Sequence, residues 1–96
     1  MKKLWTDIGW EDYIYWQTQD KKTLKKINEL IKDIERSGYD GIGHPEALRG
    51  DLTGWWSRRI DEKNRLVYRL ISDATDDDIN NNAIEIAQCK GHYSEN

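Results

Sequence analysis

Residues 22 to 34 carry a helical pattern of apolar side chains, and this pattern restricts the possible folds of the chain more than any other feature. The apolar residues have the spacing of one helix face: Leu24, Ile27, Leu30, Ile31 and Ile34. The positions between them are mostly charged and are expected to face solvent: Lys22, Lys25, Lys26, Lys32 and Asp33. Gly38 suits the end of this helix because glycine readily adopts a left-handed backbone conformation. The segment is therefore predicted to be an amphipathic helix that must pack against another element.

From residue 55 onward the apolar pattern changes to a period of two, which predicts strands. Residues 55–60 and 65–71 flank a polar turn at 61–64 and together predict a hairpin, and residues 83–90 predict a last strand. In the middle strand, alternation places Leu66, Tyr68 and Leu70 on one face and Arg65, Val67 and Arg69 on the other. The polar run 72–82 is expected to be a long hairpin loop.

The first half of the chain supplies the remaining elements. Leu4 and Trp5 suggest a short strand, and Asp7 is expected to cap a helix in which Trp10, Tyr13, Ile14 and Gln17 follow helical spacing. Residues 38–54 hold five glycines and the only proline, Pro45, and are expected to form a loop. This order predicts an α+β domain, with two N-terminal helices packed on one face of a mainly antiparallel sheet. Polar residues from several strands could then meet on the opposite, concave face.

The composition is that of one small folded domain, residues 1–96. The chain is polar, with 36% apolar and 34% charged residues, but five Trp and five Tyr supply large surfaces for burial and exclude global disorder. No apolar run is long enough to span a bilayer, and the N-terminus lacks the apolar core of a secretory signal, so we expect a cytoplasmic protein without a membrane partner.

The cysteine and histidine content gives no sign of a metal or cofactor. Cys89 is the only cysteine, so the chain forms no internal disulfide and no multi-cysteine zinc site. It lies in an alternating apolar run and is expected to be a small strand residue rather than a nucleophile. His44 and His92 are the only other soft ligands, too few for a structural zinc site.

The net charge of −3 argues against a nucleic-acid partner, but the charge is unevenly distributed. Residues 44–69 contain four acidic and six basic residues, the latter being Arg49, Arg58, Arg59, Lys63, Arg65 and Arg69. Residues 73–85, in contrast, contain five acidic residues and no basic one. Arginine is well suited to forked contacts with phosphate. The segment 44–69 therefore forms either a basic binding face or a solvated sheet edge with scattered arginines.

A set of polar residues around this segment could carry out chemistry: Glu46, Arg49, Arg59, Arg65, His92 and Tyr93. Arg59 and Arg65 flank the predicted hairpin turn and should be neighbours across it. A base, an acid and fixed positive charge suffice for metal-free RNA cleavage by a ribose 2′-hydroxyl. Glu46 is the natural base and His92 the natural acid. The simpler alternative is that Glu46 is an ordinary loop residue and His92 and Tyr93 are surface residues.

At these residues the sequence resembles the YoeB (Txe) family of bacterial toxins, a branch of the RelE superfamily found in type II toxin–antitoxin systems. The resemblance rests on GHPEALR at 43–49, LTGWWSRRI at 52–60, RLVY at 65–68 and the pair HY at 92–93. The N-terminal half continues it with WEDY at 10–13 and KKINELIKD at 25–33.

The resemblance implies a small RelE-like, microbial-ribonuclease-like fold and an mRNA interferase, a toxin that enters the ribosomal A site and cleaves the message there. It implies Glu46 as general base, His92 as general acid, Arg65 as transition-state clamp and Tyr93 beside it positioning the RNA. Arg49 and Arg59 resemble the phosphate- and RNA-contacting residues of the family. The implied partners are mRNA, the ribosome and a YefM/Phd-type antitoxin, and family members commonly form homodimers.

Two other functions stay open at this point. The acidic run 73–78 and Gly91 would be compatible with a binding module that docks on the ribosome or on an antitoxin without turnover. A toxin of the same fold could also act on another target, such as DNA gyrase. Such an inhibitor would not need an acid–base pair, so the joint presence of Glu46, His92 and Tyr93 argues against it.

Overall fold

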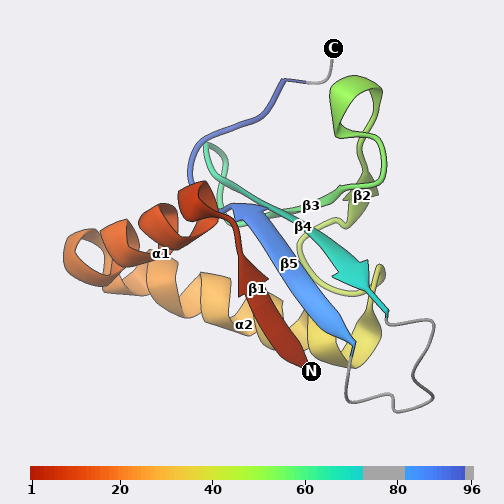
Figure 1. Ribbon diagram of the computed structural model, residues 1–96. Helices are drawn as coiled ribbons and strands as arrows, with labels where there is room; N and C mark the ends of the chain where they lie inside the picture. Colours follow the sequence, from red (N-terminus) through yellow and green to blue (C-terminus); the bar gives the residue numbers. More distant parts are fainter. Residues whose placement is uncertain (73–81, 95–96) are drawn as a thin grey trace.

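The computed structural model describes residues 1–72 and 82–94. Its helices are α1 (Asp7–Gln19) and α2 (Lys21–Ser37), with a 3-10 turn at Gly50–Leu52. Its strands are β1 (Lys2–Trp5), β2 (Glu46–Ala47), β3 (Trp56–Arg59), β4 (Arg65–Ile71) and β5 (Ala83–Gln88). They form one sheet in the order β1-β5-β4-β3-β2, in which the β1–β5 pair is parallel and the β5–β4, β4–β3 and β3–β2 pairs are antiparallel. The predicted α+β class is confirmed, and Figure 1 shows both helices on the same side of the sheet. Most of the predicted loop 72–82 lies outside the described residues.

Helix α2 packs on the sheet through the face that its spacing predicts. Ile27, Leu30 and Ile34 are fully buried, Ile31 is nearly so, and Leu24 lies at the edge of the core. Burying each such side chain stabilises the fold by about 1.5–3 kcal/mol. The helix begins after Asp20, whose carboxylate accepts hydrogen bonds from two backbone amides of the first turn, and ends at Gly38, whose φ is +65°.

Helix α1 differs from its prediction at both its cap and its buried face. Its N-cap is Thr6 rather than Asp7, and the Thr6 hydroxyl accepts a hydrogen bond from the Gly9 amide at 3.0 Å. Its buried residues are Gly9 and Trp16, whereas Trp10 is about half exposed. Gly9 allows the helix to approach the sheet closely, because a Cβ there would lie 2.5 Å from the Ile86 carbonyl oxygen.

The strands confirm the hairpin and shift several of its predicted ends. β4 has the predicted bounds, while β3 is shorter than 55–60 and β5 ends at Gln88 rather than residue 90. The chain leaves the sheet after β5 because Cys89 bonds to α1 instead: its amide donates to Asp12 and its carbonyl accepts from the Trp16 indole. The segment 38–54 also contains elements that were not predicted, the short strand β2 and the 3-10 turn.

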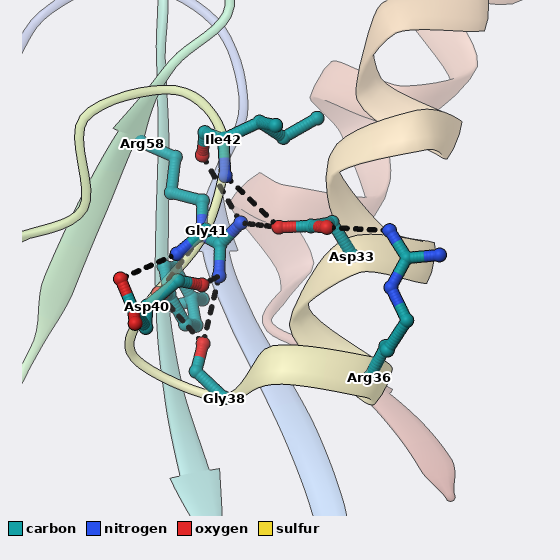
Figure 2. A network of polar contacts seen from close by, with 8 residues as sticks. Asp33, Arg36, Gly38, Asp40, Gly41, Ile42 and Arg58 are labelled. Atoms are coloured by element: carbon teal, nitrogen blue, oxygen red, sulfur yellow. Dashed lines mark hydrogen bonds and ion pairs between the residues drawn. The ribbon is translucent and has the colours of Figure 1, made fainter.

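Two charged residues expected at the surface form a buried ion pair instead. Arg58 is completely buried and Asp33 is 4% exposed, and their side chains meet at 2.5 Å (Figure 2). Asp33 therefore does not belong to the solvated face of α2, and Arg58 is not part of a basic surface. The position of Arg58 accounts for both corrections. Arg58 alternates in phase with Trp56 on β3 and so points toward the helices, where it contacts Asp33 of α2.

This ion pair anchors the loop after α2. The Arg58 guanidinium donates to the backbone carbonyls of Gly38, Asp40 and Ile42, and Asp33 accepts from the Ile42 amide (Figure 2). Arg58 also donates to the Tyr68 hydroxyl. A burial this deep is tolerated because each polar group has a partner. Hydrogen bonds from Arg58, Arg36 and the Ile42 amide lower the pKa of Asp33 from 3.8 to about 2.

Acid is therefore expected to weaken the fold through Asp33. Its carboxylate has a lower pKa when folded than when unfolded, so its contribution is complete above about pH 4 and is lost as the pH falls through about 2. The loss should be on the order of 2 kcal/mol. The measurement is the urea unfolding free energy of the wild type and of Asp33→Asn between pH 2 and pH 6. The difference between the two proteins should narrow toward low pH, and a constant difference would contradict the assignment.

Candidate active site

The register of three strands places four polar side chains on the sheet face opposite the helices. Glu46 on β2 pairs with Ser57 on β3, and Arg59 on β3 pairs with Arg65 on β4. Directly opposed residues of antiparallel strands share a face, and Ser57 and Arg59 share it because they are two residues apart. The expected closeness of Arg59 and Arg65 is confirmed.

The loop that precedes Glu46 is fixed to β3 through its backbone. The Arg59 amide donates to the Gly43 carbonyl at 2.7 Å, just beyond the carbonyls that Arg58 holds. Gly43 has a φ of +82°, and a Cβ there would lie 2.9 Å from the Leu30 side chain, so any other residue would be strained at this position. The next residue, His44, also has a positive φ, +51°, and is the one non-glycine residue of the described chain in this conformation.

The C-terminal tail is brought to the same place by contacts with the hairpin turn. The Arg65 amide donates to the Gly91 carbonyl at 3.0 Å, and the Gly91 amide donates to the Asn64 side chain at 2.8 Å. Gly91 has a φ of +77°, a conformation that turns the tail toward the hairpin. Figure 1 shows the tail and the segment around β2 at the same end of the sheet. His92 and Tyr93 therefore lie beside the hairpin, where they share a lining with Arg59 and Arg65.

These elements enclose a hollow of about 280 Å³, which we call the polar pocket. Its lining consists of His44, Glu46, Ser57, Arg59, Arg65, His92 and Tyr93. Within it the His92 and Tyr93 rings stack with their centroids 4.6 Å apart, and the Tyr93 hydroxyl shares a hydrogen bond with the Ser57 hydroxyl at 3.0 Å. The Arg65 guanidinium is oriented by the carbonyls of Asp61 and Asn64. One carboxylate, two imidazoles, one phenol and two guanidiniums thus face one space.

Five of the six residues singled out from the sequence line the polar pocket: Glu46, Arg59, Arg65, His92 and Tyr93. Arg49 is not among the lining residues, and it lies immediately before the 3-10 turn. Two lining residues were missed, His44 and Ser57. Ser57 could have been found from the alternation that puts it in phase with Arg59. The chemical roles of all these residues stay predictions.

Outside the polar pocket, the described residues present no evident catalytic group. Cys89 is buried, and burial raises the pKa of its thiol to about 12, which fits a packing residue rather than a nucleophile. Over residues 1–72 and 82–94, no three His, Cys, Asp or Glu side chains are grouped so that they could hold a metal ion. None of the helices in this part of the chain combines the length and the apolar character needed to cross a bilayer.

The polar pocket can place acid–base groups and positive charge around a single phosphate. A carboxylate on β2 and an imidazole on the tail approach the space from two different segments, while the two guanidiniums come from the hairpin between them. Such an arrangement suits proton transfer on two sides of a phosphorus atom whose added negative charge is stabilised by arginine.

Comparison with known proteins identifies close relatives. Residues 5–93 match the family described as YoeB-like toxin of bacterial type II toxin-antitoxin system. Toxin YoeB of Escherichia coli K12 is 50% identical over 93 residues, which cover 97% of this chain and 100% of that protein. A YoeB/ParE toxin from Agrobacterium tumefaciens has a TM-score of 0.87 at 41% identity, covering 97% of this chain and all of that one.

Two structures from Staphylococcus aureus concern assemblies. The YoeB dimer has a TM-score of 0.81 at 47% identity, and the heterotetrameric YoeB–YefM toxin–antitoxin complex has a TM-score of 0.80 at 46% identity. Each covers 97% of this chain and 98% of the chain compared.

Proposed function

The chain belongs to the family of YoeB-like toxins of bacterial type II toxin–antitoxin systems, and on this premise we propose that it is an mRNA interferase. In this role it is a ribosome-dependent endoribonuclease that cleaves mRNA in the A site and thereby inhibits translation. The observation that carries the proposal is the polar pocket, in which a carboxylate, an imidazole and two guanidiniums from separate segments converge.

In the proposed reaction, Glu46 takes the proton from the ribose 2′-hydroxyl, and the 2′-oxygen attacks the adjacent phosphorus. Arg65 and Arg59 stabilise the negative charge that builds up on the phosphate oxygens. The bond from phosphorus to the 5′-oxygen breaks, and His92 gives that oxygen a proton. The products are a 2′,3′-cyclic phosphate and a 5′-hydroxyl. Tyr93 positions the RNA beside Arg65, and no step requires a metal ion.

The proposed partners are mRNA, the ribosome and an antitoxin. The complex formed by the S. aureus relative supports a YefM-type antitoxin, and the dimer of that relative supports a homodimer. Arg49 is proposed as a further RNA contact outside the polar pocket. The cytoplasm is the proposed site of action, because that is where translating ribosomes are found.

The proposal is tested by offering the purified protein one mRNA in two states, free in solution and bound to 70S ribosomes with an empty A site. We expect cleavage within the A-site codon of the bound message and none of the free message at the same concentration. Failure to cut either message would overturn the proposed activity. Equal cutting of both would overturn its dependence on the ribosome.

Ser57 is expected to act on cleavage through Tyr93. Ser57→Ala removes the hydrogen bond to the Tyr93 hydroxyl, and one neutral hydrogen bond contributes about 0.5–1.5 kcal/mol, so cleavage should slow by roughly 2–10-fold. Tyr93→Phe removes the same bond from the other side. The measurement is a double-mutant cycle in the single-turnover rate on ribosome-bound mRNA. The double variant should lose less than the product of the two single losses, whereas independent effects would contradict the coupling.

A further inference from the structure

The polar pocket contains a second imidazole, His44, to which the proposed reaction gives no role. His44 lines the same space as Glu46, Arg59 and Arg65, and it is exposed to solvent. His44 is therefore placed where it could contact RNA bound in the polar pocket, although the sequence patterns did not single it out.

The backbone conformation at His44 is one that glycine would adopt more readily than histidine. With φ at +51° the residue adopts a left-handed conformation that glycine accepts without penalty and other residues adopt at a cost of about 1 kcal/mol or more. Strained residues of this kind persist where surrounding contacts fix them, and they concentrate at functional sites.

The contacts that hold His44 in place are part of the network around Arg58. Immediately before His44, the Gly43 carbonyl accepts from the Arg59 amide at 2.7 Å, and the Ile42 carbonyl accepts from Arg58 at 3.1 Å. Pro45 follows and restricts the backbone on the other side. His44 therefore lines the polar pocket from a backbone that these contacts fix.

The charges around His44 determine what it can bind. The other charged or titratable groups of the pocket lining are Glu46 on β2, Arg59 on β3, Arg65 on β4, and His92 and Tyr93 on the tail. One carboxylate facing two permanent cations leaves the hollow suited to an anion. A protonated imidazole adds a third positive group, and a neutral imidazole does not.

We propose that His44 is an RNA-binding residue of this site, whose imidazolium form binds a phosphate of the nucleic acid. The inference rests on the proposed function, since it assigns an additional contact to the same RNA. Its consequence is that RNA binding strengthens when the His44 imidazole is protonated, through a group distinct from the general acid His92.

The test measures binding rather than cleavage, so that the two proposals can fail separately. The probe is a fluorescently labelled 2′-O-methyl RNA oligonucleotide, which has no free 2′-hydroxyl and cannot be cut by the proposed reaction. Its dissociation constant is determined at pH 5.5 and pH 8 for the wild type, His44→Gln and His44→Lys. A matched control is His92→Gln, which removes the other imidazole of the polar pocket.

At pH 5.5 we expect His44→Gln to bind about fivefold more weakly than the wild type, the size of a solvent-exposed ionic contact, and at pH 8 to bind equally well. His44→Lys, which is charged at both values, should bind tightly at both. His92→Gln should retain the part of the pH dependence that His44 supplies. Equal binding by wild type and His44→Gln at pH 5.5 would overturn the proposal, whether or not the protein cleaves mRNA.

A glycine variant separates binding from a structural role. His44→Gly relieves the left-handed strain, so its unfolding free energy should be no lower than that of the wild type although it loses the RNA contact. A histidine kept for the fold would give the opposite result, a less stable protein with unchanged RNA binding, and that outcome would overturn the proposal.

Discussion

Replacing Glu46 by Gln will slow cleavage of ribosome-bound mRNA by about 10²–10⁴-fold, because the amide cannot accept the 2′-hydroxyl proton. The change is isosteric, and the Glu46 side chain is exposed on the short strand β2, so the fold should keep its stability. The measurement is the single-turnover rate on 70S-bound message, with the urea unfolding free energy of each protein determined in parallel.

His92→Gln should give a loss of similar size, because the leaving 5′-oxygen then departs without a proton donor. The matched control is Glu62→Gln, which neutralises an exposed carboxylate in the hairpin turn outside the polar pocket lining and should cleave at the wild-type rate. Wild-type rates in both Glu46→Gln and His92→Gln would remove the assigned acid–base pair. A loss in Glu62→Gln equal to theirs would attribute the effect to net charge instead.

Replacing Arg58 by Met will lower the unfolding free energy by about 3–5 kcal/mol, the largest stability change we expect from a single substitution in this protein. The variant leaves the Asp33 carboxylate buried without its main partner and removes the donor to three loop carbonyls. The cost of unpaired buried polar groups is greater than what the apolar methionine gains. The measurement is equilibrium urea unfolding near neutral pH.

The control for this prediction is Arg36, the second arginine that pairs with Asp33. Arg36 contacts the other carboxylate oxygen at 2.7 Å, but its side chain is 76% exposed. Exposed pairs contribute at most about 1 kcal/mol, so Arg36→Met should have a small effect. Equal losses in Arg36→Met and Arg58→Met would show that burial does not determine the contribution of this pair. Arg58→Lys, which retains the charge but not the forked geometry, should fall between them.

The spacing of apolar side chains along the chain correctly predicted the elements whose pattern is local, helix α2 and strand β4. The apolar face of α2 was read correctly because five residues repeat at helical spacing, and β4 was placed correctly because its side chains alternate. The pairing of Arg59 with Arg65 followed from the short turn between them. At the start of α1, however, Thr6 and Asp7 are both good caps, and nothing local distinguishes them.

Features that depend on distant partners could not be predicted in the same way. Asp33 and Arg58 were assigned to solvent because each is charged, and only their pairing across the core makes burial possible. The early end of β5 depends on Asp12 and Trp16, more than 70 residues away along the chain. The convergence of Glu46 and His92 was expected from their chemistry, but the position of His44 depends on a loop that Arg58 holds from the opposite side of the sheet.

The most direct test of the account is the chemistry of the ends that cleavage produces. Ribosome-bound mRNA cut by the wild-type protein should carry a 2′,3′-cyclic phosphate on one fragment and a 5′-hydroxyl on the other. A 2′-deoxy substitution at the nucleotide on the 5′ side of the cut should abolish cleavage at that position. Fragments with a 3′-hydroxyl and a 5′-phosphate, or undiminished cleavage of the 2′-deoxy message, would contradict attack by the ribose hydroxyl and with it the roles assigned to Glu46 and His92.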